Sequence, residues 1–232
     1  MATPTPALIP SARTPDIHHS SATGYAHSKL VGERVVEAAT KVGAKATVLR
    51  IGQIVPARNL GSQLWNPNEA MPLMIRTAST LGVLPDALNR KGADICTWLE
   101  ADTLARSMIE LSEIERERRS VSGLKVYNLV NPRQISWKLE MIPALKAAGL
   151  DFEVVNFGVW LGRLRAENDP QKNPSRKLLG FWEEQENTGL GNSGEVVFET
   201  VQAEALSEAL RSAERVVDGD MVDKLAKSWQ KV

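Results

Sequence analysis

The chain has 232 residues, of which 43% are hydrophobic and 24% are charged, so its composition excludes wholesale disorder. Its 28 basic and 28 acidic residues give a formal net charge of zero, which argues against a role in binding nucleic acid or an anionic membrane. The single cysteine, Cys96, excludes an internal disulfide, and the lack of a long apolar stretch predicts a cytoplasmic protein without a membrane span.

The first two thirds of the chain predict alternating helices and strands. Residues 1–23 hold four prolines and no apolar periodicity, so we expect an irregular N-terminal arm. Apolar residues at helical spacing predict a helix over 28–42, ended by Gly43, and the mainly apolar segment 46–51 predicts a strand buried on both faces. The same reasoning predicts further helices at 69–81, 103–114 and 137–148, the last with Ser136 as its N-cap, and strands at 95–99, 126–130 and 152–155.

The last third of the chain predicts mainly helices. Apolar periodicity indicates helices at 159–165, 175–184, 204–213 and 220–229. Together with the preceding strands, this pattern predicts an α/β fold with a helical C-terminal part.

Two patterns that resemble binding motifs receive plainer interpretations. The segment Gly189–Gly194 fits G-x-G-x-x-G, but it follows an acidic helix and precedes a strand-like segment, whereas a dinucleotide-binding turn follows a strand and opens a helix. We interpret it as a flexible loop. His18, His19 and His27 lack fixed ligand geometry and an accompanying carboxylate cluster, so we expect no metal site.

Tyr25 and Lys29 form a Y-x-x-x-K pair at the start of the first predicted helix. Four residues make about one helical turn, so the phenol and the ammonium share one face of the helix. A nearby ammonium stabilises the phenolate and lowers the pKa of the phenol, which favours general acid or base chemistry. The same spacing also occurs in surface pairs without function.

The tryptophans are expected to lie mainly in the core. Trp98, Trp137, Trp160 and Trp229 fit apolar faces of predicted helices or strands. Trp65 lies in a polar loop, where it fits either the core or the wall of a pocket.

Eight segments carry a family resemblance: GYAHSKLVGERVV, VLRIGQI, the loop around Trp65, LGVLP, WLEADTLA, VYNLVNPR, FGVWLGRLR and DPQKNPSRKLL. In this order they resemble the thioester reductase domain that terminates carboxylic acid reductases, aminoadipate reductases and nonribosomal-peptide-synthetase-like proteins. That domain belongs to the extended short-chain dehydrogenase/reductase superfamily. The resemblance implies three parts: an arm at 1–23, a partial, truncated Rossmann-like α/β core at 24–155, and a mainly helical substrate-binding lobe at 156–232.

The resemblance also implies roles for single residues. Tyr25 corresponds to the proton donor, and Lys29 to the residue that positions the cofactor ribose and tunes the tyrosine. Gly52, Gln53 and Ile54 correspond to the segment beside the nicotinamide, if NADPH is bound at all. The substrate pocket is expected to include Trp65, Asn66 and Met71.

Family members place the first βαβ units, a glycine-rich pyrophosphate-binding turn and a catalytic Ser or Thr before this tyrosine. Residues 1–23 are too few for a βαβ unit of about 30 residues. We therefore expect the chain to be the C-terminal part of such a domain, without its N-terminal dinucleotide-binding half. Ser20, Ser21 and Thr23 precede the tyrosine, but none can be matched to the family hydroxyl.

Three functions remain open on this basis. The main hypothesis is a stand-alone enzyme of specialised metabolism that works without a cofactor and without hydride transfer on a polyketide- or peptide-derived small molecule. Its reaction would be a condensation, cyclisation, dehydration or pericyclic ring closure. The alternatives are part of an NADPH-dependent thioester reductase that releases an aldehyde, and a non-enzymatic docking module. An apolar face left uncovered predicts a homodimer or a partner protein.

Overall fold

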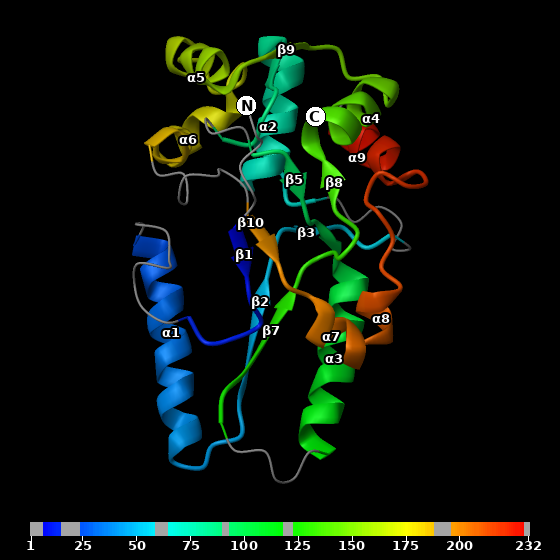
Figure 1. Cartoon of the computed structure of the whole chain (residues 1–232). Helices are drawn as coiled ribbons and strands as arrows, with labels where there is room; N and C mark the ends of the chain where they lie inside the picture. The colour runs from blue at the N-terminus through cyan, green and yellow to red at the C-terminus, as the bar shows by residue number, and fades with distance from the viewer. Residues whose placement is uncertain are drawn as a thin grey trace, which may run out of the picture.

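The computed structural model describes residues 7–14, 24–58, 65–89, 93–117, 123–187 and 196–229. In these residues the strands form five two-stranded sheets with helices around them (Figure 1). Four pairs are parallel: β1 (Ala7–Ile9) with β10 (Val196–Phe198), β2 (Thr47–Ile51) with β7 (Lys125–Leu129), β3 (Ile54–Val55) with β6 (Leu99–Glu100), and β4 (Val83–Pro85) with β9 (Glu153–Val155). The pair of β5 (Ile95–Cys96) and β8 (Ile135–Ser136) is antiparallel. Parallel pairs need crossover connections, and helices supply them here, as is typical of α/β proteins.

The helices are, in chain order, α1 (Gly24–Lys41), α2 (Ala70–Leu81), α3 (Ala101–Glu117), the single π-helical turn η2 (Trp137–Met141), α4 (Ile142–Ala147), α5 (Phe157–Ala166), the 3₁₀ turn η3 (Pro174–Leu178), α6 (Leu179–Asn187), α7 (Val201–Leu206), α8 (Glu208–Arg211) and α9 (Met221–Trp229). Within the described ranges, no helix is long and apolar enough to cross a membrane. The helices α1 and α3 flank the longest strand pair, β2 and β7 (Figure 1).

The alternation of side chains between the two faces of β2 and β7 explains why α1 and α3 lie on opposite sides of this strand pair. Arg50 of β2 reaches Glu33 of α1, with Nε 2.7 Å from Oε1 and Nη2 2.8 Å from Oε2. Tyr127, on the opposite face of β7, donates its hydroxyl to Glu115 of α3 at 2.7 Å. Because successive side chains of a strand point to opposite faces, the same strand pair contacts both helices.

Predicted signals set several helix ends. Gly43 and Gly149 adopt the left-handed φ values of 97° and 90° just after α1 and α4, where a side chain would be strained. The Ser136 hydroxyl accepts a hydrogen bond from the Leu139 N–H at 2.8 Å, so Ser136 is the N-cap that the sequence predicts. The helix after it begins as the π-helical turn η2 and not as an α-helix.

The structure differs from expectation in the N-terminal arm. Residues 1–23 were expected to be irregular, but Ala7–Ile9 form β1 and pair in register with β10. The Ser11 N–H donates to Glu199 Oε2 at 2.7 Å, and the buried Asn128 amide on β7 donates to the Ile9 carbonyl at 3.0 Å. Residues 7–11 are therefore tied to β7 and to β10 with the Glu199 that follows it.

Two further elements differ from the predicted ones. The strand expected at 95–99 is split into β5 and β6. Thr97 and Trp98 lie between these two strands, and their carbonyls accept hydrogen bonds from the backbone and side chain of Asn131. The helix expected at 204–213 is interrupted at Ser207, whose hydroxyl caps α8 by accepting from the Leu210 N–H.

Two apolar clusters form the core. The larger one joins α2, α4, α5, α6 and α9 and contains Trp98, Trp137 and Trp160, which are 5%, 0% and 0% exposed and confirm the core prediction for these three residues. The smaller cluster packs α3, α7 and α8 against the Tyr127 face of β7.

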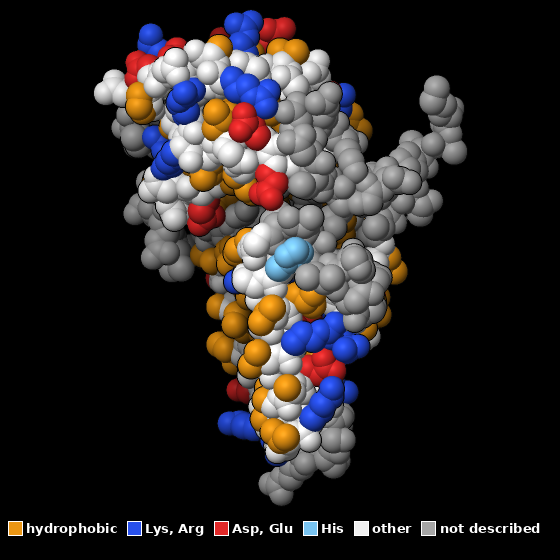
Figure 2. Space-filling model, turned by 90° about the vertical axis from the view of Figure 1, so that its left-hand side faces the viewer, with side chains coloured by type: hydrophobic (Ala, Val, Ile, Leu, Met, Phe, Trp, Pro, Cys, Tyr) orange, Lys and Arg blue, Asp and Glu red, His pale blue; other side chains and the backbone are white. Residues whose placement is uncertain are grey.

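One face of α1 is apolar and exposed. Val31 and Val35 are 62% and 63% exposed, Val42 just after the helix is 87% exposed, and Figure 2 shows hydrophobic side chains running along this helix. The opposite face carries Glu33 and Glu37, which form ion pairs with Arg50 and Arg13. A surface helix usually turns its apolar stripe inward, whereas this stripe faces outward. The homodimer or partner protein expected from the sequence stays a prediction.

Candidate active site

The first turns of α1 present Tyr25 and Lys29 on one face, as their spacing predicts. The Lys29 ammonium lies 5.0 Å from the centroid of the Tyr25 ring, and Tyr25 is 73% exposed. At such an exposed site a cation over an aromatic ring stabilises the pair by about 0.5–1 kcal/mol. The Ser28 hydroxyl donates to the Tyr25 carbonyl at 2.7 Å, which holds this first turn. A phenol and a cation are thus available to a ligand from solvent.

Gly52, Gln53 and Ile54 lie where β2 ends. A short connection joins the end of α1 to the start of β2, so the two elements run antiparallel, and the first turns of α1 lie at the same end as the carboxyl end of β2 (Figure 1). Ligands of open α/β sheets bind outside the carboxyl ends of the strands. The structure therefore places both predicted groups of site residues at the end of the sheet where binding is expected.

The backbone at Gly52 approaches its neighbours closely. A Cβ at this position would lie 2.8 Å from Cγ1 of Val130, which is only 2% exposed. The Gly52 N–H donates to the Leu129 carbonyl, and the Gln53 carbonyl accepts from the Leu99 N–H at 3.0 Å. This segment is therefore held against β6 and β7, and a glycine is needed there for space.

The predicted pocket residues differ in exposure. Trp65 is 3% exposed and packs edge-to-face with Trp98, with ring centroids 5.2 Å apart. Asn66 is exposed, and its side-chain carbonyl accepts from the Asn68 N–H at 3.1 Å. Met71 is half-buried in the first turn of α2. Trp65 thus belongs to the core cluster, while Asn66 lies at the surface.

Sequence reasoning did not find Glu69, which contacts two of the predicted residues. Its Oε2 accepts from the Trp65 indole N–H at 3.0 Å and from the Gln53 amide at 3.3 Å. The signal available in the sequence was only a carboxylate four residues after a tryptophan, at the start of a predicted helix.

Other predicted features lie outside the described residues: His18, His19, Ser20, Ser21, Thr23 and the segment Gly189–Gly194. His27 is described and is half-buried on α1. In the part of the chain that the structure describes, no three His, Cys, Asp or Glu side chains are grouped so that they could hold a metal ion.

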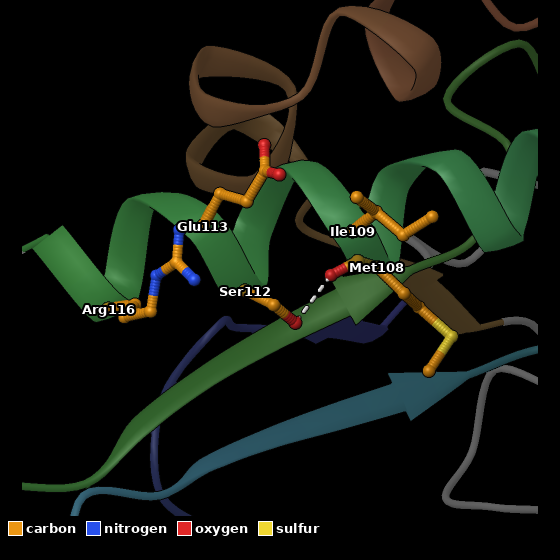
Figure 3. A pocket seen from close by; sticks show the side chains of 5 residues that line it. All are labelled: Met108, Ile109, Ser112, Glu113 and Arg116. Atoms are coloured by element: carbon orange, nitrogen blue, oxygen red, sulfur yellow. Dashed lines mark hydrogen bonds between the residues drawn. The ribbon is translucent and has the colours of Figure 1, made fainter.

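A surface hollow of about 400 Å³ lies on α3, away from these residues (Figure 3). The side chains around it all come from this one helix: Met108, Ile109, Ser112, Glu113 and Arg116. The Ser112 hydroxyl donates to the Met108 carbonyl within the helix. A hollow formed by a single helix face lacks the converging polar groups of a catalytic site.

Comparisons with known proteins agree on the fold. An NAD-binding family model described as "Male sterility protein" matches residues 5–108. The chain is 29% identical to the non-reducing polyketide synthase AC of Didymella fabae, over 97% of this chain and 8% of that protein. It is 30% identical to an adenylate-forming reductase of Stachybotrys bisbyi, over 97% of this chain and 20% of that protein.

Solved structures of similar fold include reductase domains and sugar-nucleotide epimerases. The terminal R domain of the myxalamid PKS-NRPS pathway superimposes with a TM-score of 0.78 at 22% identity, over 99% of this chain and 55% of that chain. A UDP-glucose 4-epimerase from Bifidobacterium longum, in complex with NAD⁺ and UDP, superimposes with a TM-score of 0.52 at 17% identity, over 91% of this chain and 55% of that chain. The chain thus spans about half the length of these structures and a fifth or less of the curated relatives above. The predicted α/β, Rossmann-like fold of the extended short-chain dehydrogenase/reductase type is confirmed.

One prediction from the sequence is wrong. The chain was expected to be the C-terminal part of a thioester reductase domain without the N-terminal dinucleotide-binding half. The match to the NAD-binding family begins at residue 5, and the first relatives align over 97% of the chain, its N-terminal part included. Residues before Tyr25 contain β1, a strand paired with β10, so they are not the irregular arm that this prediction assumed.

Proposed function

We propose that this chain acts as a thioester reductase-type domain of specialised metabolism, which uses NADPH to reduce a carrier-bound thioester to an aldehyde. The observation that carries the proposal is that the first turns of α1, with Tyr25 and Lys29, lie at the same end of β2 as Gly52, Gln53 and Ile54. The redox-independent reactions considered from the sequence rested on a missing dinucleotide-binding half. Since that premise is corrected, reduction has the better support.

The exposed side chains fit a nicotinamide cofactor. Lys29 supplies an ammonium donor for ribose hydroxyls, and Gln53 supplies an amide beside the strand end, while Gly52 keeps the backbone close to Val130. These are the donor types that bind neutral and anionic oxygens of such a ligand. When bound, NADPH would supply the hydride.

In this proposal the chain's own residues supply the general acid. Tyr25 donates its hydroxyl proton to the thioester oxygen as negative charge develops there, and the Lys29 ammonium stabilises the resulting phenolate. Overall, thioester, NADPH and one proton give aldehyde, thiol and NADP⁺. The carbon–sulfur bond breaks, and the thiol leaves with a proton.

The test uses the purified chain with NADPH and an acyl-coenzyme A thioester. We expect loss of NADPH absorbance together with aldehyde formation, and we expect Tyr25→Phe to slow both by at least about 100-fold, the lower end of general acid catalysis. Tyr127→Phe is the matched control, because Tyr127 is the other tyrosine of the chain and bonds to Glu115 on the α3 side. Conversion of a substrate without NADPH binding would instead support the redox-independent alternative.

A further inference from the structure

Glu69 joins the strand end at Gln53 to the loop that carries Trp65. One carboxylate oxygen, Oε2, accepts both the Trp65 indole N–H at 3.0 Å and the Gln53 side-chain amide at 3.3 Å. The same Gln53 amide also donates to the Ile54 carbonyl at 3.0 Å. The orientation of the Gln53 side chain is therefore fixed by two acceptors, of which only Glu69 comes from another part of the chain.

Glu69 lies at the N-terminus of α2, but its side chain bonds to Trp65 and Gln53 and not to the helix. Glu69 is the N-cap residue of α2, and its backbone carbonyl accepts from the Leu73 N–H at 3.0 Å. Its side chain makes no capping bond, although a capping side chain typically adds about 1 kcal/mol to helix stability. The carboxylate instead extends away from the helix end toward Gln53 and Trp65.

The described loop residues before Glu69, 65–68, are held by contacts with other parts of the chain. The Trp65 ring packs against Trp98 in the larger core cluster. The Asn68 side-chain carbonyl accepts from the Lys177 ammonium on η3, and the Pro67 carbonyl accepts from Arg76 at 3.3 Å. These contacts hold the loop that precedes Glu69 in place. Gln53, in contrast, follows the end of β2 and is only half-buried.

We infer that Glu69 is a positioning residue that holds the Gln53 amide in the orientation used for cofactor binding. The inference rests on the proposed function, since it assigns Gln53 to the cofactor. A carboxylate suits the task because hydrogen bonds to a charged acceptor are about twice as strong as neutral ones. The neighbouring Asn68 joins the same loop to Lys177 of η3.

The experiment compares Glu69→Ala, Glu69→Gln and Gln53→Ala with the wild-type chain. Glu69→Ala should raise the Kd for NADPH about tenfold, the loss expected for a charged hydrogen bond. Glu69→Gln keeps one acceptor oxygen and should raise the Kd for NADPH about threefold or less. The double variant Gln53→Ala/Glu69→Ala should bind no more weakly than Gln53→Ala alone, because both changes remove the same contact. Glu183→Ala, which removes a carboxylate paired with Arg165, is the control and should leave the Kd unchanged.

A second readout does not depend on the cofactor. In hydrogen exchange of the free protein, Glu69→Ala should speed exchange in the segment 53–55 at least about threefold relative to wild type and to Glu183→Ala. Wild-type failure to bind NADPH would contradict the proposed function, while this exchange comparison would still decide the role of Glu69. A Glu69→Ala variant with lower urea stability but unchanged exchange at 53–55 would overturn the inference.

Discussion

Replacing Gly52 with Ala should destabilise the protein through a single steric contact. The added Cβ would lie 2.8 Å from Val130 Cγ1, about 0.7 Å closer than the shortest favourable carbon–carbon separation of roughly 3.5 Å. Gly52 is not among the glycines with positive φ, so Ala meets no backbone strain there. The smaller entropy of the unfolded chain should add about 0.4–1 kcal/mol of stability, while overpacking should remove about 1–3 kcal/mol. The net expectation is a loss of about 1–2 kcal/mol.

Urea unfolding of four variants tests this reasoning. Gly32→Ala is the matched control, because a Cβ there meets nothing within 4 Å in the interior of α1, and it should raise the free energy of unfolding by about 1 kcal/mol. Val130→Ala alone should cost about 2 kcal/mol as a buried deletion. In the double variant Gly52→Ala/Val130→Ala the clash is gone, so its loss should fall short of the sum of the single losses by at least about 1 kcal/mol. Additive losses would refute the steric explanation.

Three further predictions concern charge and burial. Arg58→Ala leaves the Glu100 carboxylate, 2% exposed and 2.6 Å from Arg58, without this partner, and should lower the free energy of unfolding by about 3 kcal/mol in urea; an unchanged midpoint contradicts this. Hydrogen bonds from Arg13 and two other basic side chains lower the pKa of Glu37 from 4.5 to about 2, so its stabilisation is complete above pH 4.5 and is lost as the pH falls toward 2. The urea midpoints of wild type and Glu37→Gln should converge over that range, and a constant difference would count against the ion pairs. Burial raises the pKa of the Cys96 thiol, so it should react with a thiol reagent only after unfolding; rapid labelling of the native protein would show that the site is accessible.

Local patterns were enough to predict the elements on which the candidate site residues lie. The apolar period located α1, Gly43 marked the end of the helix, and the one-turn spacing of Tyr25 and Lys29 placed both on one face. The apolar segment located β2, although none of its residues is fully buried and the predicted burial on both faces is wrong. The positions of these elements were predicted correctly because each depends on residues close together in the sequence.

Elements that depend on distant partners were missed. The three residues of β1 have no periodicity of their own, and they become a strand because Ser11 and the Ile9 carbonyl bond to Glu199 and Asn128. Trp65 shows the same limit: its loop is polar, yet the ring is buried because Trp98 lies beside it. Without the fold, neither contact has a signal in the sequence.

The same distinction separates the residues proposed to react from the one proposed to position them. The proposed proton donor and its cation lie one helical turn apart, so their spacing is visible in a single sequence. A positioning residue needs only to reach its target in space, and Glu69 does so from the N-cap of α2 toward a residue that follows β2. The Glu69 side chain makes no capping hydrogen bond. Such an unused cap can be recognised once the helix boundary is known. Helix caps whose side chains bond outside their own helix are therefore the places to search for further positioning residues in this fold.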